Sequence, residues 1–168
     1  MIERIVVMGV SGAGKTALAG ALASALGWRF VEGDALHPPS NVAKMSAAVP
    51  LTDEDRVPFL EAVASALETG EGVVASCSAL KRSYRDLIRA RAGAVWFVLP
   101  VVDRSQLDER MRLRSGHFMP PALLASQLAT LEQPGEGEDA IVIDGSLDID
   151  ALVERVLAAL PFPRVAAA

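Results

Sequence analysis

Short apolar runs alternate along the chain with longer segments in which apolar residues recur every three or four positions. Runs that are apolar throughout are typical of parallel strands buried on both faces of a sheet, and the longer pattern is typical of amphipathic helices. Strands are expected at residues 4–8, 28–31, 72–77, 94–99 and 140–143, and helices at 16–26, 40–47, 52–68, 81–92, 103–114, 120–132 and 149–160. The alternation predicts an α/β fold, with a five-stranded parallel sheet covered by helices on both faces.

Capping residues mark several of these helix boundaries. Thr52 precedes three acidic residues and is expected to be an N-cap, and Ser40 is expected to cap the helix at 40–47. Gly27 ends the first helix. No linker divides the chain, so residues 1–160 are expected to form one domain and residues 161–168 a flexible C-terminal tail.

Composition narrows the classes of protein that fit. The 168 residues carry a net charge of −5, which argues against a nucleic-acid partner. The single cysteine, Cys77, rules out an internal disulfide and fits a reducing cytoplasm. The longest apolar run, 94–102, contains Pro100 and is shorter than the roughly 18 residues that a membrane-spanning helix needs.

A phosphate-binding loop follows the first expected strand. Its residues, Gly9, Val10, Ser11, Gly12, Ala13, Gly14, Lys15 and Thr16, match the pattern G-x-x-x-x-G-K-[ST]. Glycines allow successive backbone N–H groups to face phosphate oxygens, and the helix that follows adds its positive N-terminal dipole. Lys15 is expected to reach the β- and γ-phosphates, and the Thr16 hydroxyl to ligate Mg²⁺. The motif predicts nucleotide binding.

Two absences favour a small kinase among nucleotide-binding proteins. A GTPase carries D-x-x-G and N-K-x-D, but no Asp here precedes Gly by three positions, and Asn41, the only asparagine, precedes Val. A motor or transporter ATPase is expected to end a strand in acidic residues, whereas the third strand ends in Ser76-Cys77-Ser78.

Two carboxylates follow the second strand. Glu32 and Asp34 are two positions apart, so both point the same way in an extended segment, at the strand end where α/β proteins bind ligands. Asp34 is expected to orient an acceptor hydroxyl and take its proton, and Glu32 to face the Mg²⁺ shell through water. A plain turn residue after Gly33 is the alternative interpretation of Asp34.

Six further segments, in order along the chain, resemble the gluconate kinase (gluconokinase) family. They are Val31-Glu-Gly-Asp-Ala-Leu-His-Pro38, Asn41-Val-Ala-Lys-Met45, Pro50-Leu-Thr-Asp-Glu-Asp-Arg-Val-Pro-Phe-Leu60, Cys77-Ser-Ala-Leu-Lys-Arg-Ser-Tyr-Arg-Asp86, Arg112-Leu-Arg-Ser-Gly-His-Phe-Met-Pro120, and Leu123-Leu-Ala-Ser-Gln-Leu128 with Leu131-Glu-Gln-Pro134. The chain departs from the family at Phe59, where Trp is frequent, and at Glu32, where Asp is more familiar.

This resemblance implies a three-layer P-loop kinase fold related to shikimate and adenylate kinases, with strand order 2-3-1-4-5 and a small lid at about residues 112–121. It implies Mg²⁺-dependent phosphoryl transfer from ATP to the 6-hydroxyl of D-gluconate, by a cytoplasmic homodimer that acts on a small molecule. A kinase of another hydroxylated acceptor, such as shikimate, a nucleoside monophosphate or another sugar acid, and a nucleotide-binding regulator with little turnover remain the alternatives.

The resemblance also implies roles for individual residues. Substrate-binding residues are expected at Asp34, His37, Lys44, Arg56, Ser78, Lys81, Arg85, His117 and Gln127. Lys44, Arg56, Lys81 and Arg85 are the candidates for the gluconate carboxylate, with Arg56 favoured by analogy with shikimate kinases. Lys81 and Arg85 are four apart and are expected to share one helix face. Arg114, in the lid, is assigned to the phosphates as a catalytic residue with Lys15 and Asp34, and Arg110 to the adenine side.

Overall fold

The structure is a computed structural model that describes residues 3–113, 120 and 122–161. Its five strands form one all-parallel sheet in the order β2-β3-β1-β4-β5, which confirms the expected fold class and strand order. The strands are β1 (Arg4–Val7), β2 (Arg29–Glu32), β3 (Val73–Ser76), β4 (Trp96–Val101) and β5 (Ala140–Asp144).

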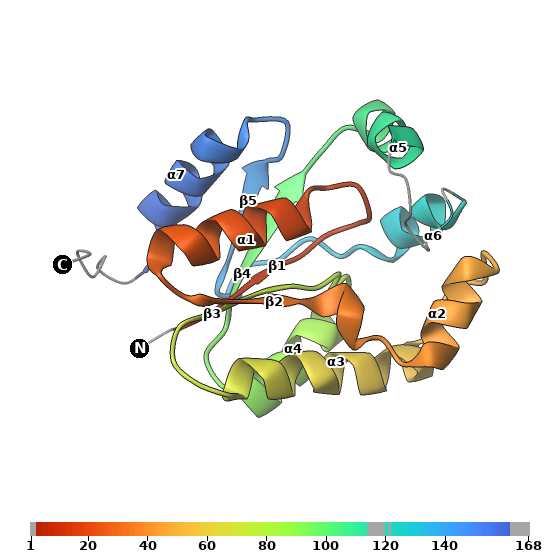
Figure 1. Ribbon diagram of the computed structural model, residues 1–168, viewed down its shortest axis with the longest axis horizontal. Coiled ribbons are helices and arrows are strands. Elements are labelled where there is room, and N and C mark those ends of the chain that lie inside the picture. Colours follow the sequence, from red (N-terminus) through yellow and green to blue (C-terminus); the bar gives the residue numbers. More distant parts are fainter. Residues whose placement is uncertain (1–2, 114–119, 121, 162–168) are drawn as a thin grey trace.

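Helices cover both faces of this sheet (Figure 1). One face packs against α1 (Lys15–Leu26) and α7 (Ile149–Ala159), and the other against α3 (Asp53–Glu68) and α4 (Arg82–Ala92). Each interface holds its own apolar cluster, so the two cores lie on opposite sides of the sheet. The remaining helices are a 3₁₀ turn, η1 (Gly33–Leu36), with α2 (Pro39–Ser46), α5 (Arg104–Leu113) and α6 (Leu123–Thr130). They lie at the edge where the strands end (Figure 1).

Most helix boundaries follow the sequence signals. Thr52 caps α3 in a capping box with Asp55, as the acidic first turn predicts. The prediction of Ser40 as an N-cap is wrong, because α2 begins at Pro39 and Pro38 is its N-cap. Proline suits the first helical position, where its missing N–H has no partner to lose and its φ is already helical.

Two elements depart from their predicted bounds by two residues or more. The strand expected at 94–99 is shifted, because β4 begins at Trp96 and continues through Pro100 to Val101. The Val98 carbonyl accepts from the Met8 amide, so the backbone of Val98 faces β1. The backbone of Pro100, two residues later, faces the same side but lies beyond the end of β1. Proline is tolerated there because no neighbouring strand would pair with an N–H. The helix expected at 120–132 is shorter, because Leu131 is extended and the Glu132 amide donates to the Leu80 carbonyl.

Gly33 brings the end of β2 against the end of β3. A β-carbon at Gly33 would lie 1.8 Å from the Ser76 carbonyl oxygen, so only glycine fits there. The Gly33 amide donates to the Ser76 hydroxyl at 3.1 Å, and the Asp34 amide donates to the Glu32 carboxylate at 3.3 Å. Gly33 thus lets the chain turn against the end of β3, and Asp34 follows directly after this turn.

Arg114 and His117, with most of the lid expected at about residues 112–121 and most of the tail expected at 161–168, lie outside the described residues. Within the described part of the chain, no helix is both long enough and apolar enough to cross a membrane.

Candidate active site

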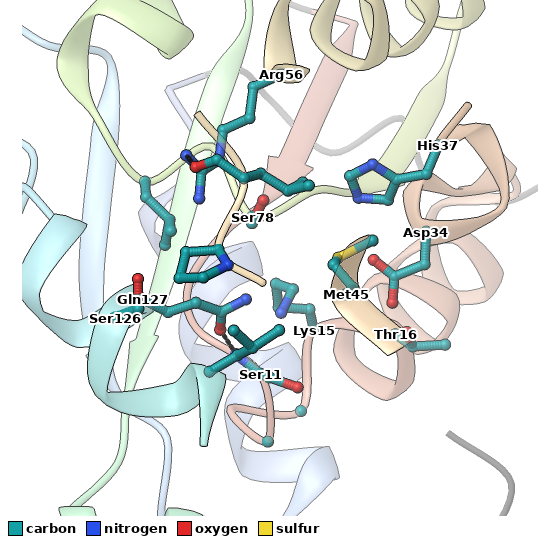
Figure 2. A pocket seen from close by; sticks show the side chains of 16 residues that line it. Ser11, Lys15, Thr16, Asp34, His37, Met45, Arg56, Ser78, Ser126 and Gln127 are labelled. Carbon is teal, nitrogen blue, oxygen red and sulfur yellow. Dashed lines mark hydrogen bonds between the residues drawn. The ribbon is translucent and has the colours of Figure 1, made fainter. Parts of the chain in front are cut away.

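A pocket with about 720 Å³ of empty space, its open mouth included, lies at the carboxyl edge of the sheet (Figure 2). Segments from most of the chain meet there: the loop after β1, η1, the start of α3, the end of β3 and α6. Of the expected site residues, its lining brings together Ser11, Gly12, Gly14, Lys15, Thr16, Asp34, His37, Arg56, Ser78 and Gln127.

The phosphate-binding loop adopts the curled backbone that its glycines predict. Gly9, Gly12 and Gly14 have φ values of 129°, 84° and 86°, a region that residues with a side chain rarely adopt. Lys15 begins α1, and its ammonium donates to the Val10 carbonyl at 2.9 Å. The loop therefore presents backbone N–H groups, a helix N-terminus and an ammonium group together, which suits a polyphosphate.

Asp34 supplies the carboxylate of this pocket. Among the described residues that line it, Asp34 is the only acidic side chain, and Figure 2 shows it on the same side as Thr16. Glu32 does not line the pocket, and its carboxylate accepts from the Ser76 hydroxyl at 2.6 Å as well as from the Asp34 amide. Glu32 thus holds the turn that carries Asp34.

The donor set suits a metal ion that is shared with phosphates. Within the described part of the chain, no three His, Cys, Asp or Glu side chains come together as a metal site. Mg²⁺ is usually held by one or two protein oxygens together with substrate phosphates and water. The Thr16 hydroxyl, at the start of α1 in the pocket wall, is placed to be such a ligand.

Arg56 is the cation of the pocket on the side away from the phosphate-binding loop (Figure 2). One end of its guanidinium donates to the Leu51 carbonyl at 2.6 Å and to the Tyr84 hydroxyl at 3.3 Å. Tyr84 in turn donates to the Asp53 carboxylate, and this hydrogen bond is the largest cause of the lowered pKa of Asp53. Tyr84 and Asp53 therefore orient Arg56, a role that sequence reasoning missed although both stand in the quoted segments.

Arg85 does not reach the pocket, so the prediction that it binds substrate is wrong. Its side chain is fully buried and forms two hydrogen bonds to Glu138, of 2.7 and 2.9 Å. It also donates to backbone carbonyls, including that of Ala79 at 3.2 Å. Arg85 lies on the face of α4 that packs into the core, whereas Lys81 precedes the helix as its N-cap, so the two do not share a face.

Lys44 and Lys81 are also absent from the pocket lining. The Lys44 ammonium lies 2.7 Å from Asp55, and its hydrogen bond is the main cause of the lowered pKa of that carboxyl. The Lys81 ammonium lies 3.0 Å from Asp53. Of the four cations considered for a substrate carboxylate, Arg56 is the one that the structure places in the pocket.

Comparison with known proteins points to one family. A protein-family profile described as an AAA domain matches residues 5–134. The gluconokinase of Gluconobacter oxydans is 49% identical over 157 residues, covering 91% of this chain and 88% of that protein. The chain belongs to the gluconokinase family. A solved gluconokinase from Sinorhizobium meliloti is 51% identical, with a TM-score of 0.84 over 92% of this chain and 89% of that one.

The gluconokinase fold extends to more distant kinases. The shikimate kinase of Aquifex aeolicus is 14% identical, with a TM-score of 0.66 over 92% of this chain and 94% of that one. At that identity the likeness concerns the fold alone, and it confirms that the chain shares the fold of shikimate kinases, as expected.

Two residues expected to bind ligand touch the phosphate-binding loop itself. The buried Gln127 of α6 accepts from the Ser11 amide at 2.7 Å. Arg110 of α5 donates to the Gly12 carbonyl at 3.2 Å and to the Gly145 carbonyl at 3.3 Å. Arg110 also borders a second hollow, with Leu113, Leu147 and Ile149 among its lining residues. This apolar hollow lies next to the loop, on the side that the gluconokinase resemblance assigns to adenine.

Sequence reasoning missed the less polar part of the pocket at the carboxyl edge of the sheet. Its further lining residues are Met45, Pro50, Leu51, Leu80, Leu123 and Ser126. Each stands in one of the segments quoted for the resemblance, but all except Ser126 are apolar, and apolar residues in such positions are equally typical of core packing. The quoted segments therefore contained these lining residues, but their residue types did not distinguish pocket from core.

Proposed function

We propose that the protein transfers the γ-phosphoryl group of ATP to the 6-hydroxyl of D-gluconate, with Mg²⁺, giving 6-phosphogluconate and ADP. The observation that carries the proposal is the meeting of a phosphate-binding loop, one carboxylate and one arginine in a single pocket. Those three parts match a polyphosphate donor, an acceptor hydroxyl and an acceptor carboxylate. Membership of the gluconokinase family supports the acceptor.

Each step of the transfer has a residue in the pocket. Lys15 and the loop amides hold the β- and γ-phosphates. Asp34 accepts the proton of the 6-hydroxyl while the oxygen of that hydroxyl bonds to phosphorus. The bond from phosphorus to the ADP oxygen breaks, and the negative charge leaves with ADP. Mg²⁺, with Thr16 as a ligand, would supply charge neutralisation of the phosphates. Ser78 and Gln127 complete the wall around the acceptor.

The gluconokinase resemblance supports further parts of the proposal. It assigns Arg114 to the transferring phosphate and His117 to the substrate, both in a lid that closes over ATP. It assigns Arg110 to the adenine side. It also favours a cytoplasmic homodimer.

A panel of acceptors tests the proposed function. We expect ADP release, in a coupled assay with ATP and Mg²⁺, with D-gluconate and not with shikimate, glucose or nucleoside monophosphates. Turnover on another acceptor but not on gluconate would overturn the choice of substrate. Nucleotide binding without turnover on any acceptor would favour the regulator instead.

Replacement of Arg56 by lysine tests the carboxylate site. Lysine keeps the positive charge but lacks the planar guanidinium. In Arg56 one end of that group donates to Leu51 and Tyr84, and the other nitrogens remain as donors for the substrate. We expect the KM for gluconate to rise roughly 10- to 100-fold, the equivalent of one charged hydrogen bond, with the KM for ATP unchanged. Arg82→Lys, at an exposed arginine of α4, is the matched control. An unaltered gluconate KM in Arg56→Lys would exclude Arg56 as the carboxylate ligand.

A further inference from the structure

The side-chain amide of Asn41 has a fixed orientation. Asn41 is buried in α2, and its Nδ2 atom lies 2.8 Å from the backbone carbonyl oxygen of Asp55. A carbonyl oxygen can only accept, so the group that faces it must be the NH₂ end of the amide. One of the two amide hydrogens is thereby committed to Asp55.

The same nitrogen sets the protonation of His37. Asn41 Nδ2 also lies 3.3 Å from His37 Nδ1. An amide NH₂ donates and does not accept, so Nδ1 must offer its lone pair. The ring is then the neutral tautomer that carries its proton on Nε2.

Burial supports the neutral ring independently of this hydrogen bond. His37 stacks on Phe59 of α3, with ring centroids 3.7 Å apart and planes 10° from parallel. Burial lowers the pKa of His37 to about 4, with Asp34 raising it and Arg56 lowering it by smaller amounts. These two are the charged groups that act on the ring from η1 and α3. The imidazole is therefore uncharged at neutral pH.

His37 lines the pocket, whereas Asn41 does not (Figure 2). With Nδ1 bonded to Asn41 and one ring face against Phe59, Nε2 is the nitrogen left for a ligand. Among the described residues, no group forms a hydrogen bond with Nε2. A neutral N–H donor beside the Asp34 carboxylate suits a hydroxyl group. The hydroxyl oxygen can accept from Nε2–H, and its hydrogen can be donated to Asp34.

We infer that His37 is a specificity residue that donates its Nε2 hydrogen to a hydroxyl oxygen of the polyol acceptor, and that Asn41 is the positioning residue that fixes this tautomer. The inference rests on the proposed function for the identity of the acceptor. A protonated Nε2 cannot accept the hydroxyl proton, so that proton goes to Asp34, the only acidic side chain among the described residues of the pocket wall. His37 thus discriminates between a hydroxyl oxygen and a group that lacks lone pairs.

The tautomer can be observed without any substrate. The chain has two histidines, so long-range ¹H–¹⁵N correlation spectra contain two imidazoles, and the one lost in His37→Gln is His37. We expect a protonated Nε2 and an unprotonated Nδ1, unchanged from about pH 8 down to about pH 5, as a pKa of about 4 requires. A protonated Nδ1, or titration near the ordinary value of 6.5, would overturn the inference. Because this experiment needs no turnover, its outcome is separate from that of the acceptor panel.

Three variants test the donor and its positioning. His37→Gln retains an N–H donor and His37→Leu does not, so kcat/KM for gluconate should be at least about tenfold higher in His37→Gln. Equal losses in the two variants would contradict a donor role. Asn41→Asp is nearly isosteric but accepts from Nδ1–H, so the proton should move to Nδ1 and the gluconate KM should rise about tenfold, with the ATP KM unchanged. An unchanged tautomer in folded Asn41→Asp would rule out the positioning role, and the wild-type spectrum decides the question if this variant fails to fold.

Discussion

Replacement of Asp34 by asparagine is expected to lower kcat about 10²- to 10⁴-fold while ATP continues to bind. Asparagine has nearly the same shape as aspartate but cannot take a proton. No other carboxylate among the described residues lines the pocket, so no neighbour there replaces it. Single-turnover kinetics and titration with a fluorescent ATP analogue measure the two effects separately.

A matched control separates chemistry from a general loss of charge. Asp139→Asn makes the same change at an exposed residue that precedes β5, at the opposite end of the parallel sheet from the pocket. We expect that variant to retain wild-type kcat. A near-normal kcat in Asp34→Asn would exclude Asp34 as the base. A loss of ATP affinity equal to the loss of kcat would instead place Asp34 in the binding of nucleotide and metal.

The features of the fold and of the candidate site that were predictable depend on residues close together in the sequence. The phosphate-binding loop is one continuous segment that contains its glycines, its lysine and the start of α1. Asp34 was predictable because it follows a strand, and the carboxyl ends of parallel strands meet at one edge. Thr52 was predictable because a capping box needs only four consecutive residues. Such features depend on residues close in sequence.

Side-chain direction was not predictable where it depends on distant partners. Arg85 and Arg56 both stood in segments of the resemblance, yet Arg85 faces the core and Arg56 the pocket. The difference comes from the rotation of α4 against the sheet and from Glu138, 53 residues away from Arg85. Tyr84, which orients Arg56, is likewise 28 residues distant from it. Hydrophobic periodicity does not report on such pairs, because arginine is usually exposed.

Replacement of Arg85 by methionine is expected to lower the free energy of unfolding by about 3 kcal/mol, a typical cost of leaving one member of a buried ion pair alone. Glu138 is 2% exposed, and among the described residues the Arg89 guanidinium, 3.3 Å away, would be the one cation left beside it, together with the Gly135 amide at 3.1 Å. Chemical denaturation measures the change. Because Arg85 also holds the Ala79 carbonyl, next to Ser78 of the pocket, a rise in the gluconate KM should accompany the loss of stability.

Arg82→Met is the control for the Arg85 variant, since Arg82 is 57% exposed and lies 3.7 Å from Asp86. It should cost less than about 1 kcal/mol. Adding Glu138→Gln to Arg85→Met should restore part of the lost stability, because the unpaired charge is removed. Equal, small effects of the two methionine variants would contradict a stabilising role for the buried pair.

The pH dependence of stability distinguishes the Arg85–Glu138 pair from packing alone. Hydrogen bonds from Arg85 are the largest cause that lowers the pKa of Glu138 from 4.5 to about 2. Above about pH 4.5 the carboxylate is ionised in both states, and its contribution to stability is complete. As the pH falls from 4.5 towards 2, the unfolded chain takes up a proton that the folded protein does not, so stability decreases by about 3 kcal/mol. In Arg85→Met the folded pKa returns towards its ordinary value, and this decrease should largely disappear. The same acid dependence in wild type and variant would show that Arg85 does not hold the Glu138 carboxylate in its ionised form.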